Sequence, residues 1–101
     1  MKYTARFPGL SIQKKFEKVL RLISQTKIQD EIMLSVESLE QNPRPFGQKF
    51  FKTLNPPIKL YEWVAQYRLR IGDYRVLYDV DDQRQIIWIL ALRKRNENTY
   101  K

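Results

Sequence analysis

The stretch from Gln66 to Asp79 constrains the fold of this chain more than any other. It consists of two segments of alternating side chains joined by Gly72-Asp73. A two-residue hairpin loop with glycine in its first central position favours a type II′ turn, because glycine reaches positive φ at little cost. The register that follows from this turn pairs Ile71 with Tyr74, Arg70 with Arg75, Arg68 with Leu77 and Gln66 with Asp79.

The predicted hairpin has two unlike faces, because side chains alternate across a strand. One face is apolar apart from its tyrosine hydroxyls and can bury against helices: Tyr67, Leu69, Ile71, Tyr74, Val76 and Tyr78. The other face carries three arginines: its members are Gln66, Arg68, Arg70, Arg75, Leu77 and Asp79. Three guanidinium groups are therefore expected on one small area of an open sheet face.

This arginine cluster has two interpretations. Like charges directly opposite each other on a sheet cost up to ~1 kcal/mol, so a cluster selected for stability alone needs compensation. Asp73, Asp79 or Glu62 could neutralise it, or water could screen it. Alternatively the cluster binds a polyanion, because guanidinium is always protonated and its fork matches a phosphate group.

The total charge favours the second interpretation. The net charge is +8. Residues 1–41 carry seven positive and five negative side chains, a net of +2, whereas residues 42–101 carry twelve and six, a net of +6. Such a balance favours acidic partners, of which nucleic acid is the commonest. The chain has no histidine, so the usual side chain for proton transfer at neutral pH is missing.

Length and residue types bound the remaining possibilities. A chain of 101 residues is expected to form a single domain over residues 1–101. There is no cysteine, which excludes disulfides and thiolate chemistry and fits a reducing compartment. No apolar run has the length of a membrane span or the form of a signal peptide. We therefore expect a soluble, cytoplasmic protein with no membrane partner.

Hydrophobic periodicity predicts a strand and then two helices ahead of the hairpin. Residues 2–7 alternate and end at a Pro-Gly pair. Ser11 is a candidate cap for a helix with apolar residues at 3.6-residue spacing. Thr26 and Gln29 have capping-box spacing for a second helix that continues to Leu39. The short connection predicts an antiparallel helical hairpin.

The rest of the chain is predicted to complete a sheet. Residues 46–57 are expected to be a loop, and residues 58–64 to be extended and to begin the strand that continues to Ile71. Residues 86–92 are apolar on both faces, which is typical of a covered central strand. The prediction is an α+β fold: an N-terminal strand, a helical hairpin and a three-stranded antiparallel meander. The four strands form one sheet with the helices packed on one face.

Three aspartates around the predicted turn at residues 81–84 do not predict a metal site. Asp79, Asp81 and Asp82 are ordinary turn residues, and no further carboxylate or histidine joins them. Directly after the central strand the chain changes to Arg93-Lys94-Arg95 and ends in Tyr100-Lys101.

These residues resemble those of a known family. The hairpin around Gly72-Asp73-Tyr74-Arg75, an apolar strand, Arg93-Lys94-Arg95 and a closing Tyr100 are together similar to the RelE/ParE toxin superfamily of type II toxin–antitoxin systems. The resemblance covers essentially the whole chain and implies a RelE-like fold. Members of the RelE branch cut messenger RNA in the ribosomal A site without a metal ion or cofactor, whereas ParE-type members inhibit DNA gyrase. The basic residues near a C-terminal tyrosine are more similar to the RelE branch.

The resemblance implies roles for individual residues. Arg75 matches the arginine at the scissile phosphate, Arg95 a later arginine, and Tyr100 the terminal tyrosine that stacks on a base or assists proton transfer. Arg93 competes with Arg95, because the spacing from Arg95 to Tyr100 is one residue shorter than in the best-known pattern. Arg68 completes the catalytic set at a position where lysine is frequent. The expected RNA-binding residues are Arg70, Arg93, Lys94 and Lys52. Gln66 stands where a second lysine is common, which is a departure from the family pattern.

Three functions follow as hypotheses. The first is a ribosome-dependent mRNA endoribonuclease, in which the 2′-hydroxyl attacks the adjacent phosphate. The second is a ParE-like gyrase inhibitor, and the third is a non-catalytic member that only binds its antitoxin. In the first, the ribosome and mRNA are partners. The resemblance implies a cognate antitoxin, RelB-like or similar, which would reach operator DNA only as the complex.

Overall fold

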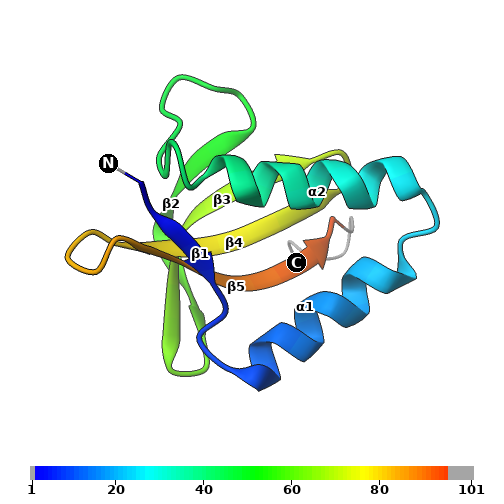
Figure 1. Cartoon of the computed structure of the whole chain (residues 1–101), viewed down its shortest axis with the longest axis horizontal. Coiled ribbons are helices and arrows are strands. Elements are labelled where there is room, and N and C mark those ends of the chain that lie inside the picture. Colours follow the sequence, from blue (N-terminus) through cyan, green and yellow to red (C-terminus); the bar gives the residue numbers. More distant parts are fainter. Residues whose placement is uncertain (1, 96–101) are drawn as a thin grey trace.

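Two helices cover one face of a five-stranded sheet in the computed structural model, which describes residues 2–95 (Figure 1). The elements are β1 (Thr4–Arg6), α1 (Leu10–Leu22), α2 (Thr26–Ser38), β2 (Phe51–Leu60), β3 (Trp63–Ile71), β4 (Tyr74–Asp81) and β5 (Ile86–Lys94). The strand order is β1-β5-β4-β3-β2, with β1 parallel to β5 and all other neighbours antiparallel. The predicted α+β class is confirmed, and the N-terminal strand joins the same sheet as the hairpin and the central apolar strand.

The sheet has one strand more than predicted, because the expected loop at 46–57 is partly a strand. β2 pairs with β3 from Phe51 onward, and the register shifts between Thr53 and Ile58. Pro56 and Pro57 lie in this shift and cannot donate backbone hydrogen bonds, so the pairing stops there and resumes afterwards. An edge strand tolerates such an interruption, since one side of it faces solvent.

The predicted extended segment at 58–64 is also wrong. It is broken by the β2–β3 turn at Tyr61-Glu62, so β2 and β3 are separate strands. Tyr61 has a φ of 58°, a left-handed conformation that is uncommon outside glycine. The sequence has no glycine at this position to indicate the turn.

The helices form where predicted, but neither predicted side-chain cap is present. Ser11 lies inside α1, and the start of α2 at Thr26 has no side-chain cap either. Gln29 instead donates from Nε2 to the carbonyl oxygens of Leu20, at 3.0 Å, and Ile23, at 2.8 Å. It therefore adds a second donor to the Leu20 carbonyl, which also accepts from the Ile23 N–H at 3.2 Å, and provides a side-chain donor to the Ile23 carbonyl at the end of α1.

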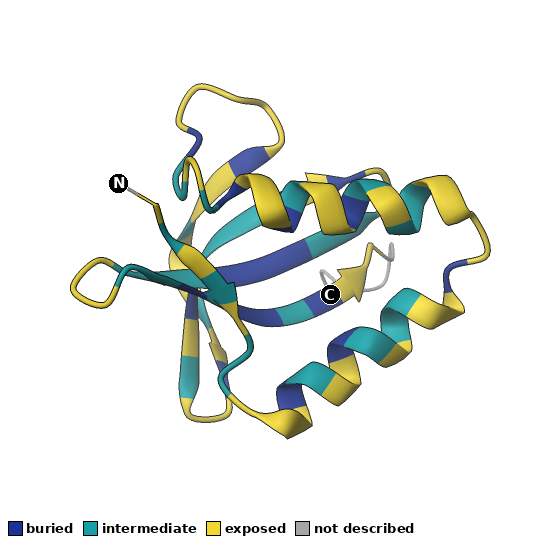
Figure 2. Cartoon of the chain, viewed as in Figure 1, coloured by how far each residue is buried: buried dark blue, intermediate teal, exposed yellow. Residues whose placement is uncertain are grey.

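The two helices run in opposite directions but diverge from their short connection (Figure 1). α1 packs mainly against β5 and α2 against β3. Their shared core includes Phe16 from α1, Ile32 and Val36 from α2, and Leu69 and Val76 from the sheet. The predicted helical hairpin is thus an open pair held together by the sheet. Figure 2 shows buried positions along β4 and on the sides of the helices that face the sheet. Neither helix of residues 2–95 has the length and apolarity that crossing a bilayer requires.

The hairpin register is confirmed for three of its four predicted pairs: Ile71 with Tyr74, Arg70 with Arg75 and Arg68 with Leu77. The predicted pair of Gln66 with Asp79 does not form, because the pairing of β3 with β4 begins at Tyr67 and Tyr78. Gly72 has a φ of 57°, the positive value that a type II′ turn needs at its first central position. The apolar face packs against the helices, and Tyr78 at its centre is fully buried.

The opposite sheet face is less open than predicted. Leu77 lies on it and is only 2% exposed, because a second apolar cluster of Leu60, Ala65, Leu77 and Leu90 covers this part of the face. Leu90 is an extra residue on β5, where the register shifts between Leu77 and Tyr78. This face therefore has an apolar middle, with the arginines beside it.

At the other edge of the sheet, β1 is tied to the segment that follows α2. The backbone N–H of Tyr3 donates to the Glu40 carbonyl at 3.0 Å, and the N–H of Ala5 donates to the Glu40 carboxylate at 2.8 Å. Thr4 donates in the opposite direction, to Gln85 beside β5. Both sides of this short strand are therefore hydrogen-bonded.

Candidate functional site

The sheet register places three arginines in one row. Arg75 on β4 is opposite Arg70 on β3 and opposite Arg93 on β5. Directly opposed residues project from the same face with Cβ atoms about 4.5–5.5 Å apart. Arg70 and Arg93 are exposed and Arg75 is half-buried. Arg93 therefore lies beside the two hairpin arginines.

A second row lies beside the first. Lys52 on β2 pairs with Arg68 on β3, two residues along the strand from Arg70 and therefore on the same face. We call this set the arginine face: Lys52, Arg68, Arg70, Arg75 and Arg93. Its members come from four neighbouring strands, so the sheet itself fixes their spacing.

Ion pairing within the described residues does not neutralise the exposed ends of the row. Among residues 2–95, no acidic side chain forms an ion pair with Arg70 or Arg93, which includes the three candidates from the sequence, Asp73, Asp79 and Glu62. These two guanidinium groups therefore remain available to a phosphate.

The basic residues at the end of β5 do not all project from the same face of the sheet. Lys94 is opposite Tyr74 and so projects from the helix side of the sheet, away from the arginine face. Lys94 and Arg93 do not share a face, since neighbouring residues of a strand point to opposite faces. The RNA-binding role expected of Lys94 stays a prediction. Arg95 follows β5, and its backbone N–H donates to the Asp73 carbonyl, which places it beside the hairpin turn. Tyr100 lies outside the described residues.

Arg44, in the segment between α2 and β2, is a well-connected residue. Its guanidinium donates two bonds to the Asp82 carboxylate, at 2.8 and 3.1 Å, and a third from Nε to the Tyr67 hydroxyl at 2.7 Å. The Tyr3 hydroxyl also donates to Asp82, at 2.7 Å. Arg44 and then Tyr3 lower the pKa of the Asp82 carboxyl to about 2.

This network connects elements of the fold at a distance from Arg75. It joins β1, the segment after α2, β3 and the β4–β5 turn, whereas Arg75 lies at the other end of β4. Because Asp82 is held by Arg44, it is not a free ligand for a cation. Within residues 2–95 no group of three or more potential ligands could hold a metal ion.

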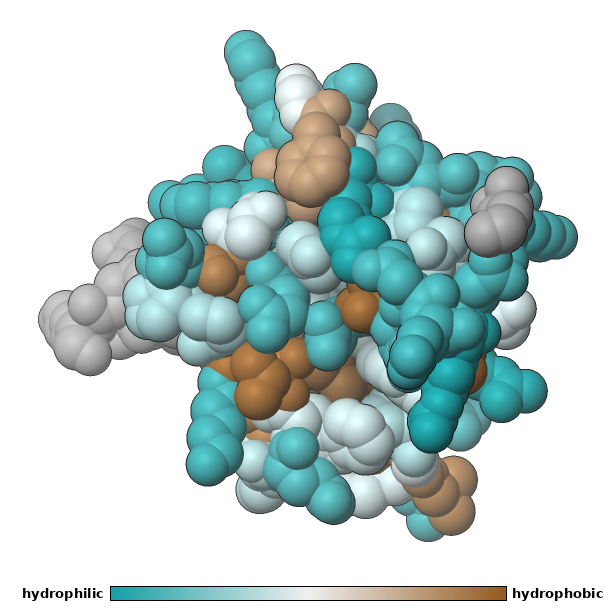
Figure 3. Space-filling model, turned by 90° about the vertical axis from the view of Figure 1, so that its left-hand side faces the viewer, coloured by the Kyte–Doolittle hydropathy of each residue, from teal (hydrophilic) through white to brown (hydrophobic). Residues whose placement is uncertain are grey.

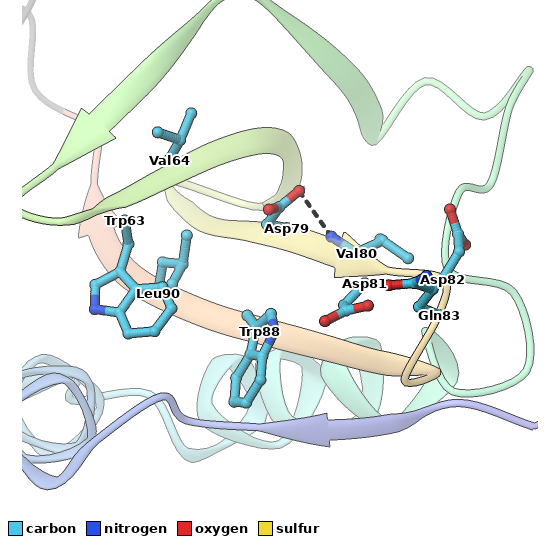
Figure 4. Close-up of a pocket in the computed structure, with 9 residues that line it drawn as sticks. All are labelled: Trp63, Val64, Asp79, Val80, Asp81, Asp82, Gln83, Trp88 and Leu90. Carbon is cyan, nitrogen blue, oxygen red and sulfur yellow. Dashed lines mark hydrogen bonds between the residues drawn. The ribbon is translucent and has the colours of Figure 1, made fainter.

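A groove of about 420 Å³ opens beyond the apolar middle of the arginine-bearing sheet face. Its lining comes from β3, β4, β5 and the β4–β5 turn: Trp63, Val64, Asp79, Val80, Asp81, Asp82, Gln83, Trp88 and Leu90. Figure 4 shows Trp63 and Leu90 at one end, Trp88 and Asp79 in the middle, and Asp81 and Asp82 toward the turn. Of these residues, the sequence indicates a role only for the aspartates, as turn residues, and no local motif links the nine.

The groove contains one unusual carboxyl group. Burial raises the pKa of Asp79, an effect only partly offset by the bond that its Oδ1 accepts from the Val80 N–H at 2.9 Å. The rings of Trp63 and Trp88 are 6.0 Å apart and tilted by 37°. Seen from the side of β1 and the β4–β5 turn, apolar residues form a limited area within a mostly hydrophilic surface (Figure 3).

Comparisons with known proteins agree on one family. The family model described as "ParE toxin of type II toxin-antitoxin system, parDE" matches residues 10–99. No curated protein is significantly similar to the chain.

Solved structures share the fold at low sequence identity. The archaeal RelE–RelB complex from Pyrococcus horikoshii OT3 matches with a TM-score of 0.69 at 24% identity, covering 96% of this chain and 99% of that one. The RelBE2 complex of Mycobacterium tuberculosis matches with a TM-score of 0.62 at 23% identity, over 94% and 100%. A mutant of the E. coli toxin RelE in its free state matches with a TM-score of 0.51 at 16% identity, over 99% and 90%.

Proposed function

The chain belongs to the ParE toxin family of type II toxin–antitoxin systems, within the RelE/ParE superfamily, and on this premise we propose that it is a ribosome-dependent mRNA endoribonuclease. The observation that carries the proposal is the row formed by Arg70, Arg75 and Arg93 across β3, β4 and β5. Three guanidinium groups at strand spacing suit a chain of phosphodiesters better than a single small anion. Arg75 is in the centre of the row, where it would contact the scissile phosphate.

The proposed reaction is an internal transesterification. The 2′-oxygen forms a bond to phosphorus as the bond from phosphorus to the 5′-oxygen breaks, which leaves a 2′,3′-cyclic phosphate and a 5′-hydroxyl. The 2′-hydroxyl proton passes to a base, and the leaving oxygen takes a proton from an acid. Negative charge grows on the phosphate oxygens, so a fixed guanidinium stabilises the transition state more than the ground state.

The chain supplies few groups for proton transfer. It has no histidine, so Tyr100 is the best remaining candidate for the base and Arg95 is the candidate for the acid. Phenol and guanidinium groups do not titrate near neutral pH in model peptides, so their contribution should be small. We therefore propose that the ribosome holds the message in an attack-ready geometry and that free RNA is cut slowly. Arg68 and Lys52 would position the neighbouring phosphates.

An antitoxin is the proposed partner. The P. horikoshii and M. tuberculosis structures are complexes of a toxin with a RelB-type antitoxin. By this likeness, an antitoxin of this chain would need acidic residues to cover the arginine face. Contact with operator DNA would belong to the complex.

The family match favours a second candidate function, inhibition of DNA gyrase, because the matching model is named for ParE. The two functions share the fold and differ in target. If the chain inhibits gyrase, the arginine face would bind gyrase or its DNA, and messenger RNA would stay intact.

Inducing the chain in a bacterium and mapping message ends on ribosomes tests the proposal. Wild type should cut messages, and Arg75→Ala should lower the cleavage rate by roughly 10²–10³, the usual effect of losing one transition-state donor. Lys94→Ala is the matched control, because it removes a cation from the opposite sheet face. Intact messages together with blocked supercoiling would establish gyrase inhibition instead. Equal loss of cleavage in both variants would show that net charge, not the arginine row, is responsible.

A further inference from the structure

The groove beside the arginine face has features that the proposed phosphate chemistry does not use. Its walls include the rings of Trp63 and Trp88, and its floor includes Leu90. Two tilted indole rings on an accessible groove present flat apolar surface to solvent, which is the kind of surface on which planar heterocycles stack.

The carboxylates of the groove are not equivalent. Asp82 is held by Arg44, and Asp81 lies 3.9 Å from the Arg84 guanidinium. Asp79 forms no ion pair within the described residues, and its one hydrogen bond comes from the Val80 backbone. The groove therefore presents one carboxylate without an arginine neighbour at bonding distance, rather than a multivalent acidic site.

Asp79 can accept more hydrogen bonds than it receives. An ionised carboxylate has about four acceptor positions, and the Val80 N–H occupies one of them. A base edge with two adjacent N–H donors would match the remaining positions. Guanine has such an edge, at N1 and N2, whereas uracil has a single donor there.

The groove lies on the same side of the sheet as the arginine face, beyond the buried Leu77. Asp79 and Arg75 lie on the same face of β4, four residues apart, with Leu77 between them. At about 3.3 Å per residue, their Cα atoms are separated by about 13 Å. A phosphate on Arg75 and a base in the groove could therefore belong to the same short single strand.

We propose that this groove binds an unstacked RNA base near the scissile phosphate, with Trp63 and Trp88 as stacking walls and Asp79 as the acceptor that favours guanine. The inference rests on the proposed function, because it assigns a second part of the same RNA substrate to the protein. Recognition of splayed-out bases by aromatic side chains and hydrogen bonds to the base edge is common in single-strand RNA binding.

Tryptophan fluorescence tests the groove directly. The chain has two tryptophans, and both line it, so a base that stacks there should quench the signal. The probes are guanosine, adenosine, cytidine and uridine, which carry no phosphate and so do not depend on the arginine face. Guanosine should bind at least about tenfold more tightly than uridine, since a matched bidentate contact discriminates by roughly 5–150-fold.

Two sets of variants separate the roles. Asp79→Asn should remove most of the preference for guanosine, while Asp30→Asn, on the exposed side of α2, should leave it unchanged. Trp88→Leu should weaken binding of all four nucleosides, and Trp88→Phe should retain most of it, with Trp63 as the reporter in both. Melting curves recorded on each variant identify any loss that comes from unfolding.

Several results would overturn the inference. Quenching by arginine amide but not by guanosine would make the groove a site for a cationic peptide. No quenching by any nucleoside would exclude base binding, and equal affinities for all four in the wild type would exclude the role of Asp79. Nucleoside binding is measured without ribosomes, so these failures are distinct from an absence of message cleavage, which would refute the proposed function instead.

Discussion

Replacing Tyr78 with phenylalanine removes one buried hydrogen bond and leaves the ring in place. Tyr78 is fully buried on β4, and its hydroxyl donates to the Pro43 carbonyl at 2.7 Å. Burial raises the pKa of this phenol, so it stays protonated as the donor. The bond fixes the segment that presents Arg44 to Asp82. Losing it should loosen the connection between α2 and the sheet.

The expected cost follows from the surroundings of the acceptor. An intramolecular hydrogen bond contributes about 1 kcal/mol net, and an acceptor left without a partner adds more only where water cannot reach it. Pro43 is half-buried, so water can replace part of the lost bond. We therefore expect the free energy of unfolding to fall by about 1–2 kcal/mol, which lowers the melting temperature by about 4–16 °C in a domain of this size.

Thermal unfolding followed by circular dichroism measures this shift. Tyr74→Phe is the matched control, because Tyr74 is half-buried on the same strand and its hydroxyl makes no hydrogen bond within the described residues. Removing the Tyr74 hydroxyl should lower the free energy of unfolding by about 0.5 kcal/mol or less. If the two variants melt at the same temperature, the bond to Pro43 does not stabilise the fold and the reasoning is refuted.

Two further predictions concern charge and backbone conformation. Asp82 has a pKa of about 2 instead of its usual 3.8, so its pair with Arg44 stabilises the fold above pH 4 and this contribution disappears as the pH falls toward 2. Asp82→Asn should therefore melt below wild type at pH 7, with the difference closing near pH 2; a constant difference would contradict the assignment. Gly72→Ala should lower the free energy of unfolding, measured in urea, by about 1–2 kcal/mol, because alanine at a φ of 57° is strained. A steric clash is not the cause, since the nearest atom to an added methyl group, on Ile28, is 3.7 Å away. Gly9→Ala should lower the free energy of unfolding far less, because Gly9 lies in open space and in extended backbone. Equal losses in the two variants would contradict the claim that the positive φ of Gly72 is what requires glycine.

The hairpin could be predicted from the sequence because its information is local. Gly72-Asp73 specifies the turn, the turn specifies the register, and alternation then assigns Arg70 and Arg75 to one face. The same rule could have separated Lys94 from Arg93, since adjacent strand residues point to opposite faces.

Other parts of the fold could not be predicted because their causes are not local. The sequence did not predict β2 because it contains Pro56 and Pro57. Proline is rare inside strands, but an edge strand such as β2 can contain it. The Arg44–Asp82 pair joins residues 38 positions apart, and no periodicity brings them together. The groove depends on Trp63 and Trp88, which approach each other only after the strands of the sheet have paired.

The two edges of the sheet have a consequence for the isolated protein. Along β1, the N–H groups of Tyr3 and Ala5 that point outward are both occupied by Glu40. Along β2, Pro56 and Pro57 offer no N–H at all. Neither margin presents an uninterrupted row of donors to a strand of another molecule, so edge-to-edge aggregation is disfavoured while the protein has no partner.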